Sequence, residues 1–469
     1  MSESRENCII VGGGPAGILA AILLADVYQN VTVVEKSAAL GGLLGSYQDD
    51  RGNHYDMGTH VPNIVNIKEL DDVLFGDAEE RDENWIKFDR VSTQNYFNGI
   101  WNRKSSFIDA RSLGREKYEK GIAEFFHADE QCSSLDDLQK FATETYGPTF
   151  AREIFAPVAG KLFGVTPDRL EAQSSLNLFG LTRLVMLTEE VSRKLKQIEF
   201  FDKKMGFHTN TGTALTHYYP RSPKGCGYWI DSLIEKAGKK GVTFKANATV
   251  NRINVKNKEI TSVETSDAGR IDCDLLVWTI PAGLALKAAG IDCPSRRPIL
   301  RTTSIFHYCL NKELLLKDAL FVWCMDPKFK SFRITLYPNL NPQKQVAGHT
   351  VTSEVLSGPE EAGQFDSETI LNELISLGIA AKDSKVLSRA QQVLHNTFPV
   401  PEVGFTDNVR QTSERLRNEI PNLLLLGRST GNTWFMTDVF RDVYEKVEKI
   451  RDGSDTAYAF HDEKHILGR

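Results

Sequence analysis

Three glycines close to the N-terminus have the spacing of a loop that cradles a diphosphate. They are Gly12, Gly14 and Gly17 in the run Gly12-Gly13-Gly14-Pro15-Ala16-Gly17. In such a loop the first glycine permits a tight turn, and the second lets the backbone approach a pyrophosphate. The third lets a helix pack closely on a strand. The first turn of that helix adds free N–H groups and the positive end of the helix dipole. The spacing therefore predicts a dinucleotide site.

A βαβ unit must position this loop, and the flanking residues have the pattern of one. Residues 8–11 and 31–34 are short apolar runs typical of buried parallel strands, and residues 18–27 between them are typical of a helix. Glu35 follows the second strand, eighteen residues after Gly17, where an acid hydrogen-bonds ribose hydroxyls. Its charge disfavours a 2′-phosphate at this site, because two anions repel each other.

Residues further along the chain distinguish between the two common dinucleotides. The ribose acid is followed by Lys36, by Gly41-Gly42-Leu43 and by Gly58-Thr59-His60, and a C-terminal apolar run ends in Gly427-Arg428. Thr437-Asp438-Val439 then opens a second helix, whose dipole would stabilise the negative charge of a reduced flavin by about 0.3–1 kcal/mol. Ordinary glycine turns and helix capping are the alternative explanations. Because an NAD site needs no second anchor, the combination favours FAD.

The patterns of the whole chain predict an α/β protein in which a Rossmann-like domain is built from separated segments. We expect residues 1–65, 220–290 and 396–469 to form a discontinuous FAD-binding domain. Residues 66–219 form a mainly helical insert and residues 291–395 a β-rich insert, which together make an α+β substrate domain. Within these segments, strands are expected at 242–244, 249–255, 274–280, 302–310 and 332–356, and helices at 178–200, 368–377 and 438–451.

Composition excludes several classes of protein. The formal charge of −6 argues against a nucleic-acid partner, since phosphate binding needs a dense basic patch. The seven cysteines include no C-x-x-C pair, so no metal site or disulfide framework is predicted, and a reduced cytoplasmic protein is expected. No apolar run approaches the roughly 18 residues of a transmembrane helix. An oligomer is compatible with the sequence.

These motifs resemble the flavin amine oxidase and protoporphyrinogen oxidase-like superfamily, whose fold is of the GR2 type and which is related to UDP-galactopyranose mutase. The similar segments include 11–17, 33–36, 41–42, 55–60, 219–227, 276–281, 426–428 and 438–439. The resemblance implies that Val250 hydrogen-bonds the adenine through its backbone and that Thr279 lies in a loop beside the cofactor. It also implies that Gly42 and Leu43 lie against the flavin ring, and that Asp438 and Val439 meet its pyrimidine edge.

The candidates for chemistry and substrate binding lie outside the nucleotide loop. His60 stands where the mutases carry Gly-Ala-His and is a candidate for moving a proton near the flavin, although a packed core histidine is the alternative. Arg333 shares one face of a predicted strand with Thr335 and Tyr337 and is a candidate clamp for a carboxylate or diphosphate, although a solvated arginine at the sheet edge is the alternative. Trp323, Trp434 and Phe435 are candidates for stacking. The turn 224–227 is expected to bring backbone near the flavin.

Three functions follow from these residues. The first is an FAD-dependent oxidoreductase that transfers hydride between a small-molecule substrate and flavin N5. The second is a redox-neutral nucleotide-sugar mutase acting through reduced flavin, with an anionic substrate. Against the mutase, the paired arginines that clamp the diphosphate in those enzymes have no match in this sequence. The third is a flavin-fold binding protein without chemistry, similar to the Rab escort proteins. His60 argues against that third possibility.

Overall fold

A parallel sheet carries the glycine loop. The computed structural model describes residues 6–128, 136–208, 215–267, 269–292, 297–342, 348–430 and 433–453. Its five-stranded sheet has the order β19-β13-β1-β2-β9, and all neighbouring strands are parallel. The strands are β1 (Asn7–Val11), β2 (Asn30–Val34), β9 (Thr243–Lys245), β13 (Leu275–Trp278) and β19 (Leu423–Leu425). The predicted fold class is therefore confirmed, and the strands lie inside the three segments assigned to the FAD-binding domain.

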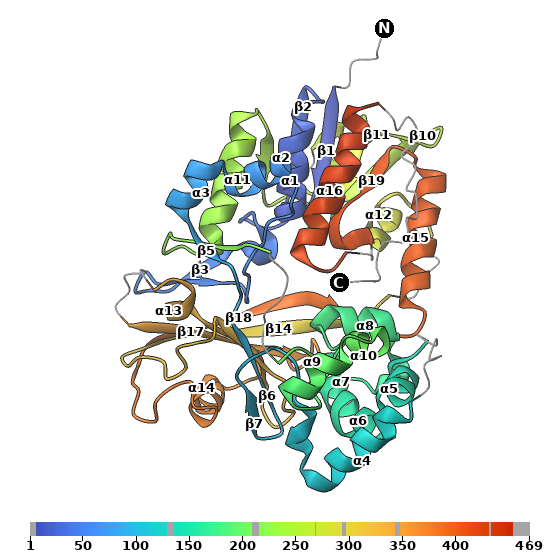
Figure 1. Ribbon diagram of the computed structural model, residues 1–469. Helices are drawn as coiled ribbons and strands as arrows, with labels where there is room; N and C mark the ends of the chain where they lie inside the picture. The colour runs from blue at the N-terminus through green and yellow to red at the C-terminus, as the bar shows by residue number, and fades with distance from the viewer. Residues whose placement is uncertain are drawn as a thin grey trace.

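Both faces of this sheet are covered, which explains why its strands are apolar throughout. Cys8 and Ile10 of β1 pack into a core formed with α1 (Pro15–Leu24), α11 (Cys226–Lys239) and α16 (Met436–Arg451). Ile9 and Val11, which point to the other face, pack with α12 (Ala282–Ala288), α15 (Phe405–Glu419) and a three-stranded antiparallel sheet. That small sheet consists of β10 (Val250–Lys256), β11 (Glu259–Thr265) and β12 (Arg270–Asp272). Helices α1 and α16 lie side by side on the sheet in Figure 1.

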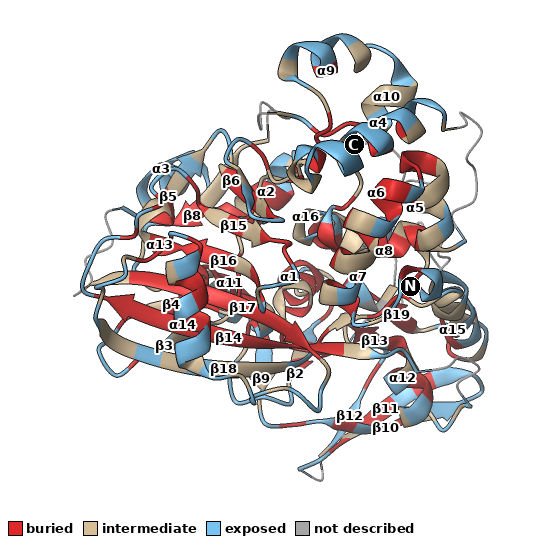
Figure 2. Cartoon of the chain, turned by 90° about the horizontal axis from the view of Figure 1, so that it is seen from below, coloured by how far each residue is buried: buried red, intermediate tan, exposed pale blue. Residues whose placement is uncertain are grey.

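A second, seven-stranded sheet lies below the first in Figure 1. Its order is β18-β14-β17-β16-β15-β6-β7, from β6 (Thr93–Phe97), β7 (Ile100–Asn102), β14 (Leu300–Leu310), β15 (Phe321–Cys324), β16 (Ser331–Leu336), β17 (His349–Ser357) and β18 (Val386–Pro399). Its central strands are almost wholly buried, as Figure 2 shows in red. Strand β18 crosses the boundary expected at residue 396, and β6 and β7 join this sheet from the segment expected to be mainly helical.

Helices pack against this second sheet. On one side lie α4 (Arg115–Phe126), α5 (Leu138–Tyr146), α6 (Pro148–Phe150), α7 (Ala156–Phe163) and α8 (Ala172–Phe179), with a π-helical turn at Ala151–Phe155. Helix α14 (Ser367–Ser376) packs in a separate core with β14 to β17, as expected at 368–377. Helix α7 is followed by Gly164, whose left-handed φ of 73° ends the helix.

The prediction of one long helix over residues 178–200 is wrong. Helix α8 ends at Phe179 because Gly180 adopts a left-handed φ of 65°, and two short helices follow, α9 (Glu189–Leu195) and α10 (Glu199–Lys204). Between α8 and α9 the chain is extended, since the N–H of Val185 donates to the Ile108 carbonyl and the Val185 carbonyl accepts from the N–H of Ala110. Backbone pairing with a distant segment therefore overrides the helical pattern. Tyr337 likewise begins α13 (Tyr337–Leu340) and is not part of the strand with Arg333.

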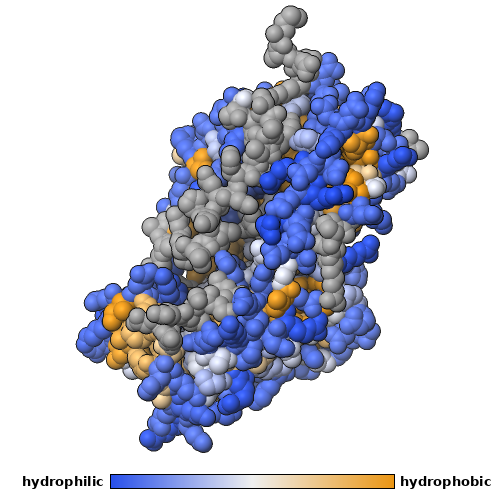
Figure 3. All heavy atoms as spheres, turned by 90° about the vertical axis from the view of Figure 1, so that its right-hand side faces the viewer, coloured by the Kyte–Doolittle hydropathy of each residue, from blue (hydrophilic) through white to orange (hydrophobic). Residues whose placement is uncertain are grey.

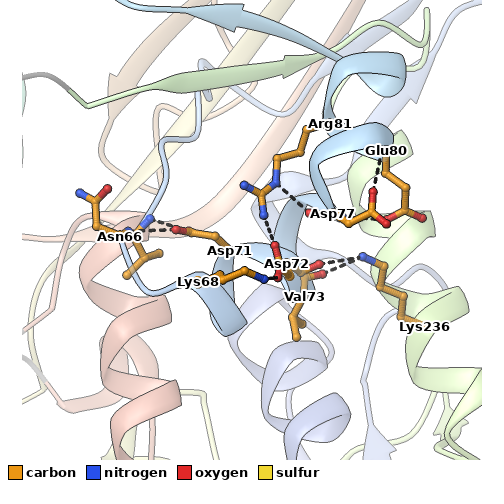
Figure 4. Close-up of polar contacts among 11 residues, drawn as sticks. Asn66, Lys68, Asp71, Asp72, Val73, Asp77, Glu80, Arg81 and Lys236 are labelled. Atoms are coloured by element: carbon orange, nitrogen blue, oxygen red, sulfur yellow. Dashed lines mark hydrogen bonds and ion pairs between the residues drawn. The ribbon is translucent and has the colours of Figure 1, made fainter.

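Short elements connect the two sheets. They are β3 (Ser46–Gln48), β4 (His54–Asp56), β5 (Trp85–Phe88), β8 (His217–Pro220), α2 (Lys68–Phe75) and α3 (Ala78–Asn84). Lys236 of α11 donates to the carbonyl of Val73 at 3.0 Å and Arg81 donates to that of Gly76 at 2.7 Å, which ties the end of α2 to its neighbours (Figure 4). Asp77 and Glu80 form a capping box at the start of α3.

Among the helices of the described residues, none is both long and apolar enough to cross a bilayer. The face shown in Figure 3 is mostly hydrophilic and carries only small, separate hydrophobic groups.

One buried lysine provides a test of this packing. Lys161 donates to the carbonyls of Cys324, Asp326 and Ser331 at 2.6–2.8 Å, and its burial lowers the pKa of its ammonium group. Lys161→Met would leave three acceptors without their donor, so we expect the free energy of unfolding to fall by about 2–4 kcal/mol. Urea denaturation measures this loss. The exposed Lys117→Met, which breaks only a surface pair with Glu153, is the matched control and should change stability by less than about 1 kcal/mol. An equal effect of the two variants would contradict a supporting role for Lys161.

Candidate active site

The glycine loop has the geometry that a diphosphate requires. Gly12 has a φ of 108°, and a Cβ there would overlap Oγ1 of Thr279. A Cβ on Gly17 would overlap the carbonyl oxygen of Gly12, so α1 approaches β1 more closely than any other residue allows. Gly14 differs, because no atom lies within 4 Å of the position of its Cβ. Gly14 also caps α1 without a side-chain hydrogen bond, which leaves the first N–H groups of α1 facing open space.

Glu35 lies beside this loop at the end of β2. Its carboxylate accepts from the N–H of Gly13 at 2.7 Å and from the N–H of Ser37 at 2.8 Å. The N–H of Ala248 donates to the Glu35 carbonyl, so the start of β10 at Val250 lies next to the predicted ribose site. Lys36 is exposed.

The second glycine pair lies directly against the first loop. The N–H of Gly41 donates to the Gly13 carbonyl at 2.8 Å, and a Cβ on Gly42 would lie 3.4 Å from the Cα of Gly14. Leu43 follows in the short 3-10 turn Gly42–Leu44 and reaches a cavity. These contacts place the two predicted cofactor loops side by side.

A cavity of about 340 Å³ begins at this point and extends toward the second sheet and its helices. Its walls come from segments far apart in the sequence. They are Leu43, Met57, Thr59, His60, Val61, Asn63, Asn95, Ser106, Phe107, Ile108, Leu178, Phe179, Gly180, Leu181, Arg183, Thr303, Trp323, Met325, Arg333, Glu354, Leu394, Thr397, Phe398, Arg428, Trp434, Phe435, Met436 and Thr437.

A buried ion pair forms part of the wall. Arg333 donates to Glu354 through Nε and Nη2, both at 2.7 Å, and its guanidinium lies 5.5 Å from the centre of the Trp323 ring. Glu354 also accepts from the N–H of Thr59 at 3.1 Å. Burial alone would raise the pKa of Glu354, but Arg333 and these hydrogen bonds hold it below its usual value. Since Arg333 is paired within the protein, two of its donors are not available to a substrate carboxylate.

Gly58 makes this pair possible. Its φ is 103°, and a Cβ there would lie 2.8 Å from Oε2 of Glu354 and 3.3 Å from Nη2 of Arg333. The loop before His60 therefore rests directly on the ion pair, which fixes where the histidine lies.

His60 is neutral at ordinary pH. Burial lowers the pKa of its imidazole to about 4, and the nearby Arg333 guanidinium lowers it further, against an opposing effect of Glu354. Nε2 is buried without a hydrogen-bond partner, so Nδ1 is the atom that hydrogen-bonds the Met57 backbone. Because the hydrogen bond to Met57 raises the pKa of the imidazole, Nδ1 carries the proton and is its donor. Nε2 therefore carries the lone pair.

Arg428 lies opposite, after the end of β19. Gly427 before it packs on Ala16 of α1 and on Val439 of α16, since a Cβ on Gly427 would lie 3.2 Å and 3.7 Å from their side chains. The arginine is exposed and lines the cavity, and desolvation by the cavity walls together with Arg333 lowers the pKa of its guanidinium. No hydrogen bond or ion pair joins Arg428 to another of the described residues.

Helix α16 opens beside Arg428. It begins at Met436 with Phe435 as its cap and no capping side chain, so Thr437 and Asp438 lie inside its first turn. Thr437 donates to the side chain of Asn63 at 2.7 Å. Helix capping therefore does not explain why Thr437 and Asp438 occur at these positions.

The cavity brings together many of the residues singled out from the sequence. Leu43, Thr59, His60, Arg333, Arg428 and Thr437 line it, as do Trp323, Trp434 and Phe435. The turn 224–227 does not line it, because the N–H groups of Cys226 and Gly227 donate to Asp56 and Ser46. Glu354 was not predicted from the sequence. The pattern that could have indicated it is an acid within a strand rich in apolar and hydroxyl side chains, since charged residues are rarely buried without a partner.

The glycine loop, Glu35 and the Gly41–Gly42 turn adjoin one another, and Leu43 and Thr437, near the start of a second helix, line the cavity. This geometry is that expected of a dinucleotide-binding flavoprotein. An elongated cofactor fits the open space at Gly14 and the unoccupied donors of two helix N-termini. Residues 15–289 match the profile of the flavin containing amine oxidoreductase family. The chain belongs to this family, and its cofactor is FAD.

Individual relatives are distant. The 1-hydroxycarotenoid 3,4-desaturase of Flavobacterium sp. (strain P99-3) is 24% identical over 338 residues, which are 69% of this chain and 64% of that protein. The chain thus spans slightly less than two thirds of the length of this relative.

Solved structures show the shared fold. Reduced UDP-galactopyranose mutase aligns with a TM-score of 0.76 at 18% identity, over 96% of both chains. A putative protoporphyrinogen oxidase from Exiguobacterium sp. 255-15 aligns with a TM-score of 0.70 at 14% identity, over 96% of this chain and 100% of that one.

Glycine substitutions separate folding from cofactor binding. Gly14→Ala meets no atom of the protein, so we expect normal thermal stability of the apoprotein, but its methyl group enters the predicted phosphate site. FAD binding should weaken by at least about tenfold, which corresponds to about 1.4 kcal/mol. Gly12→Ala should lower the stability of the apoprotein as well, because of its φ and the overlap with Thr279. FAD fluorescence titration and thermal melts measure both effects.

The control for these variants is Gly238→Ala in helix α11, where a Cβ also meets no atom. It should retain full FAD affinity. Undiminished FAD affinity in Gly14→Ala would show that the diphosphate lies elsewhere.

The lowered pKa of His60 predicts a pH dependence of stability. The unfolded chain takes up a proton near pH 6.5 and the folded protein only near pH 4, so protonation favours the unfolded state as the pH falls through this window. A difference of this size corresponds to about 3 kcal/mol. In His60→Gln the fall in unfolding free energy of the apoprotein between pH 7 and pH 4 should be smaller by about this amount. Chemical denaturation at several pH values measures it.

His307 provides the comparison, because burial also lowers its pKa to about 4. His307→Gln should reduce the acid sensitivity similarly. A wild-type pH profile in His60→Gln would contradict a neutral, buried His60.

Proposed function

We propose that the protein is an FAD-dependent oxidoreductase that transfers hydride between a small molecule bound in the cavity and flavin N5. The observation that carries this proposal is the neutral imidazole of His60, whose unpartnered Nε2 is buried in the cavity wall beside the predicted flavin loops. FAD supplies the two-electron acceptor when it is bound. The protein must then bind the substrate, exclude water and remove a proton.

His60 suits the last of these tasks. A base acts best when its lone pair is free and correctly placed, and Nε2 meets both conditions because the ring is oriented through Met57. A substrate O–H or N–H that donates to Nε2 would satisfy this buried acceptor. As hydride leaves the adjacent carbon, the proton would pass to the imidazole, and the Glu354 carboxylate nearby would stabilise the imidazolium.

The ion pair serves as the support of this base. Arg333 neutralises Glu354. Glu354 accepts hydrogen bonds from the backbone N–H and the hydroxyl of Thr59, the residue before His60. In this proposal Arg333 positions the catalytic loop and also presents its remaining donors to the cavity. The cofactor roles of Gly12 to Gly17, Glu35, Gly41 to Leu43, Val250, Thr279 and residues 437–439 are part of the same proposal.

A nucleotide-sugar mutase acting through reduced flavin is the second candidate. Two arginines, Arg333 and Arg428, lie at one end of the cavity, and the fold is shared with a UDP-galactopyranose mutase along nearly the whole chain. Dithionite-reduced protein that converts UDP-galactopyranose with no net redox change would favour the mutase over the oxidoreductase.

The role of His60 can be measured with flavin absorbance. Purified wild-type protein should absorb at about 450 nm, and one member of a panel of amines, alcohols and hydroxy acids should bleach this band under anaerobic conditions. In His60→Gln, FAD occupancy should be unchanged while the rate of bleaching falls by about 10²–10⁴-fold.

The matched control is His127→Gln, a substitution on the exposed end of α4, which should bleach at the wild-type rate. Full-speed bleaching in His60→Gln would reject the base. Loss of bound FAD in that variant would assign His60 to cofactor binding instead.

A further inference from the structure

Most polar side chains that line the cavity are already paired within the protein. The hydroxyls of Thr59 and Thr335 lie 2.5 Å apart, and those of Thr303 and Thr397 lie 2.7 Å apart. Asn95 donates to the Ser106 carbonyl at 2.9 Å. Together with the Arg333–Glu354 pair, these contacts remove much of the hydrogen-bonding capacity of the walls. A substrate rich in hydroxyls or phosphates would find few partners there.

The wall on the side of the helices and the second sheet is apolar. Its side chains are Phe107, Ile108, Leu178, Phe179, Leu181, Met325, Leu394 and Phe398, and Trp323 continues the surface toward the ion pair. Several of these residues belong to the large core of that region, so the wall is fixed by packing. Such a surface favours an apolar body through the area that binding removes from water.

One charge in the cavity is not balanced. Arg333 is neutralised by Glu354, His60 is neutral, and Arg183 lies 3.6 Å from Asp202. Arg428 is open to the cavity, and no carboxylate of the described residues lies within ion-pair distance of it. A guanidinium without a partner is satisfied best by an anion that accepts two hydrogen bonds.

We propose that the cavity binds a compact amphipathic anion, whose carboxylate pairs with Arg428 and whose apolar body lies against the Leu178–Leu181 wall. The inference rests on the proposed function, because it places this substrate beside His60 and the flavin. It also assigns Arg428 to the substrate and not to the cofactor. A nucleotide sugar is disfavoured, since its ribose, base and diphosphate need many donors that these walls have already used.

The probe for this proposal is 4-phenylbutyrate, with the neutral 4-phenylbutan-1-ol and with UDP as comparisons. Each is titrated into the FAD-loaded protein, and the shift of the flavin band at about 450 nm reports binding. We expect 4-phenylbutyrate to bind in preference to both other probes. In Arg428→Met, FAD should stay bound while affinity for 4-phenylbutyrate falls by about ten- to a hundredfold, as for loss of a charged hydrogen bond. Arg428→Lys should restore part of the affinity.

Two further variants complete the test. Leu178→Asp keeps Arg428 but places a negative charge on the apolar wall, so it should also weaken 4-phenylbutyrate binding. Arg415→Met, on the exposed surface of α15, should bind as the wild type does.

Several results would overturn the proposal. They are equal binding of the alcohol, tighter binding of UDP, no binding of 4-phenylbutyrate to FAD-loaded protein, or loss of FAD from Arg428→Met. Failure of the wild-type protein to bind FAD at all would instead refute the proposed function on which the inference rests.

Discussion

The arrangement of the cavity depends on the buried ion pair between Arg333 and Glu354. Both residues lie on neighbouring strands of the second sheet, β16 and β17, at positions that face each other in the register. Removing either charge would leave the other buried without a partner, which is strongly unfavourable. The pair contacts the loop of Gly58 and Thr59, which belongs to the N-terminal segment. A single interaction thus fixes the cofactor-side loop relative to the substrate-side sheet.

This constraint accounts for the position of His60, and burial at that position is the main cause of its lowered pKa. The ring directly follows the loop that rests on the ion pair, so it lies where Arg333 disfavours its protonation and Glu354 partly compensates. A histidine on a freely exposed loop would titrate near neutral pH. The pair that builds the wall therefore also fixes where His60 lies, while burial supplies the main lowering of its pKa. Changes to Arg333 or Glu354 are expected to act on His60 as well as on packing.

The sequence predicts local features of the site better than its assembly. The glycine loop, Glu35 and the βαβ unit are predictable because each depends on contacts within about thirty residues. The family and FAD were predicted from several such motifs together, and both are confirmed. In contrast, the pairing of Arg333 with Glu354 depends on the register between two strands, and periodicity alone does not determine register. Arg333 was therefore interpreted as a substrate clamp, although two of its donors are bonded to Glu354.

The helix expected over 178–200 failed for a related reason. Its amphipathic pattern is real, but Gly180 ends α8 and the next residues pair with Ile108 and Ala110, more than seventy positions earlier. That break turns Leu178, Phe179 and Leu181 toward the cavity. A continuous helix would present only part of this set on one face. The element that was predicted wrongly thus supplies part of the apolar wall, and the substrate specificity that we propose for this wall depends on contacts that no local pattern encodes.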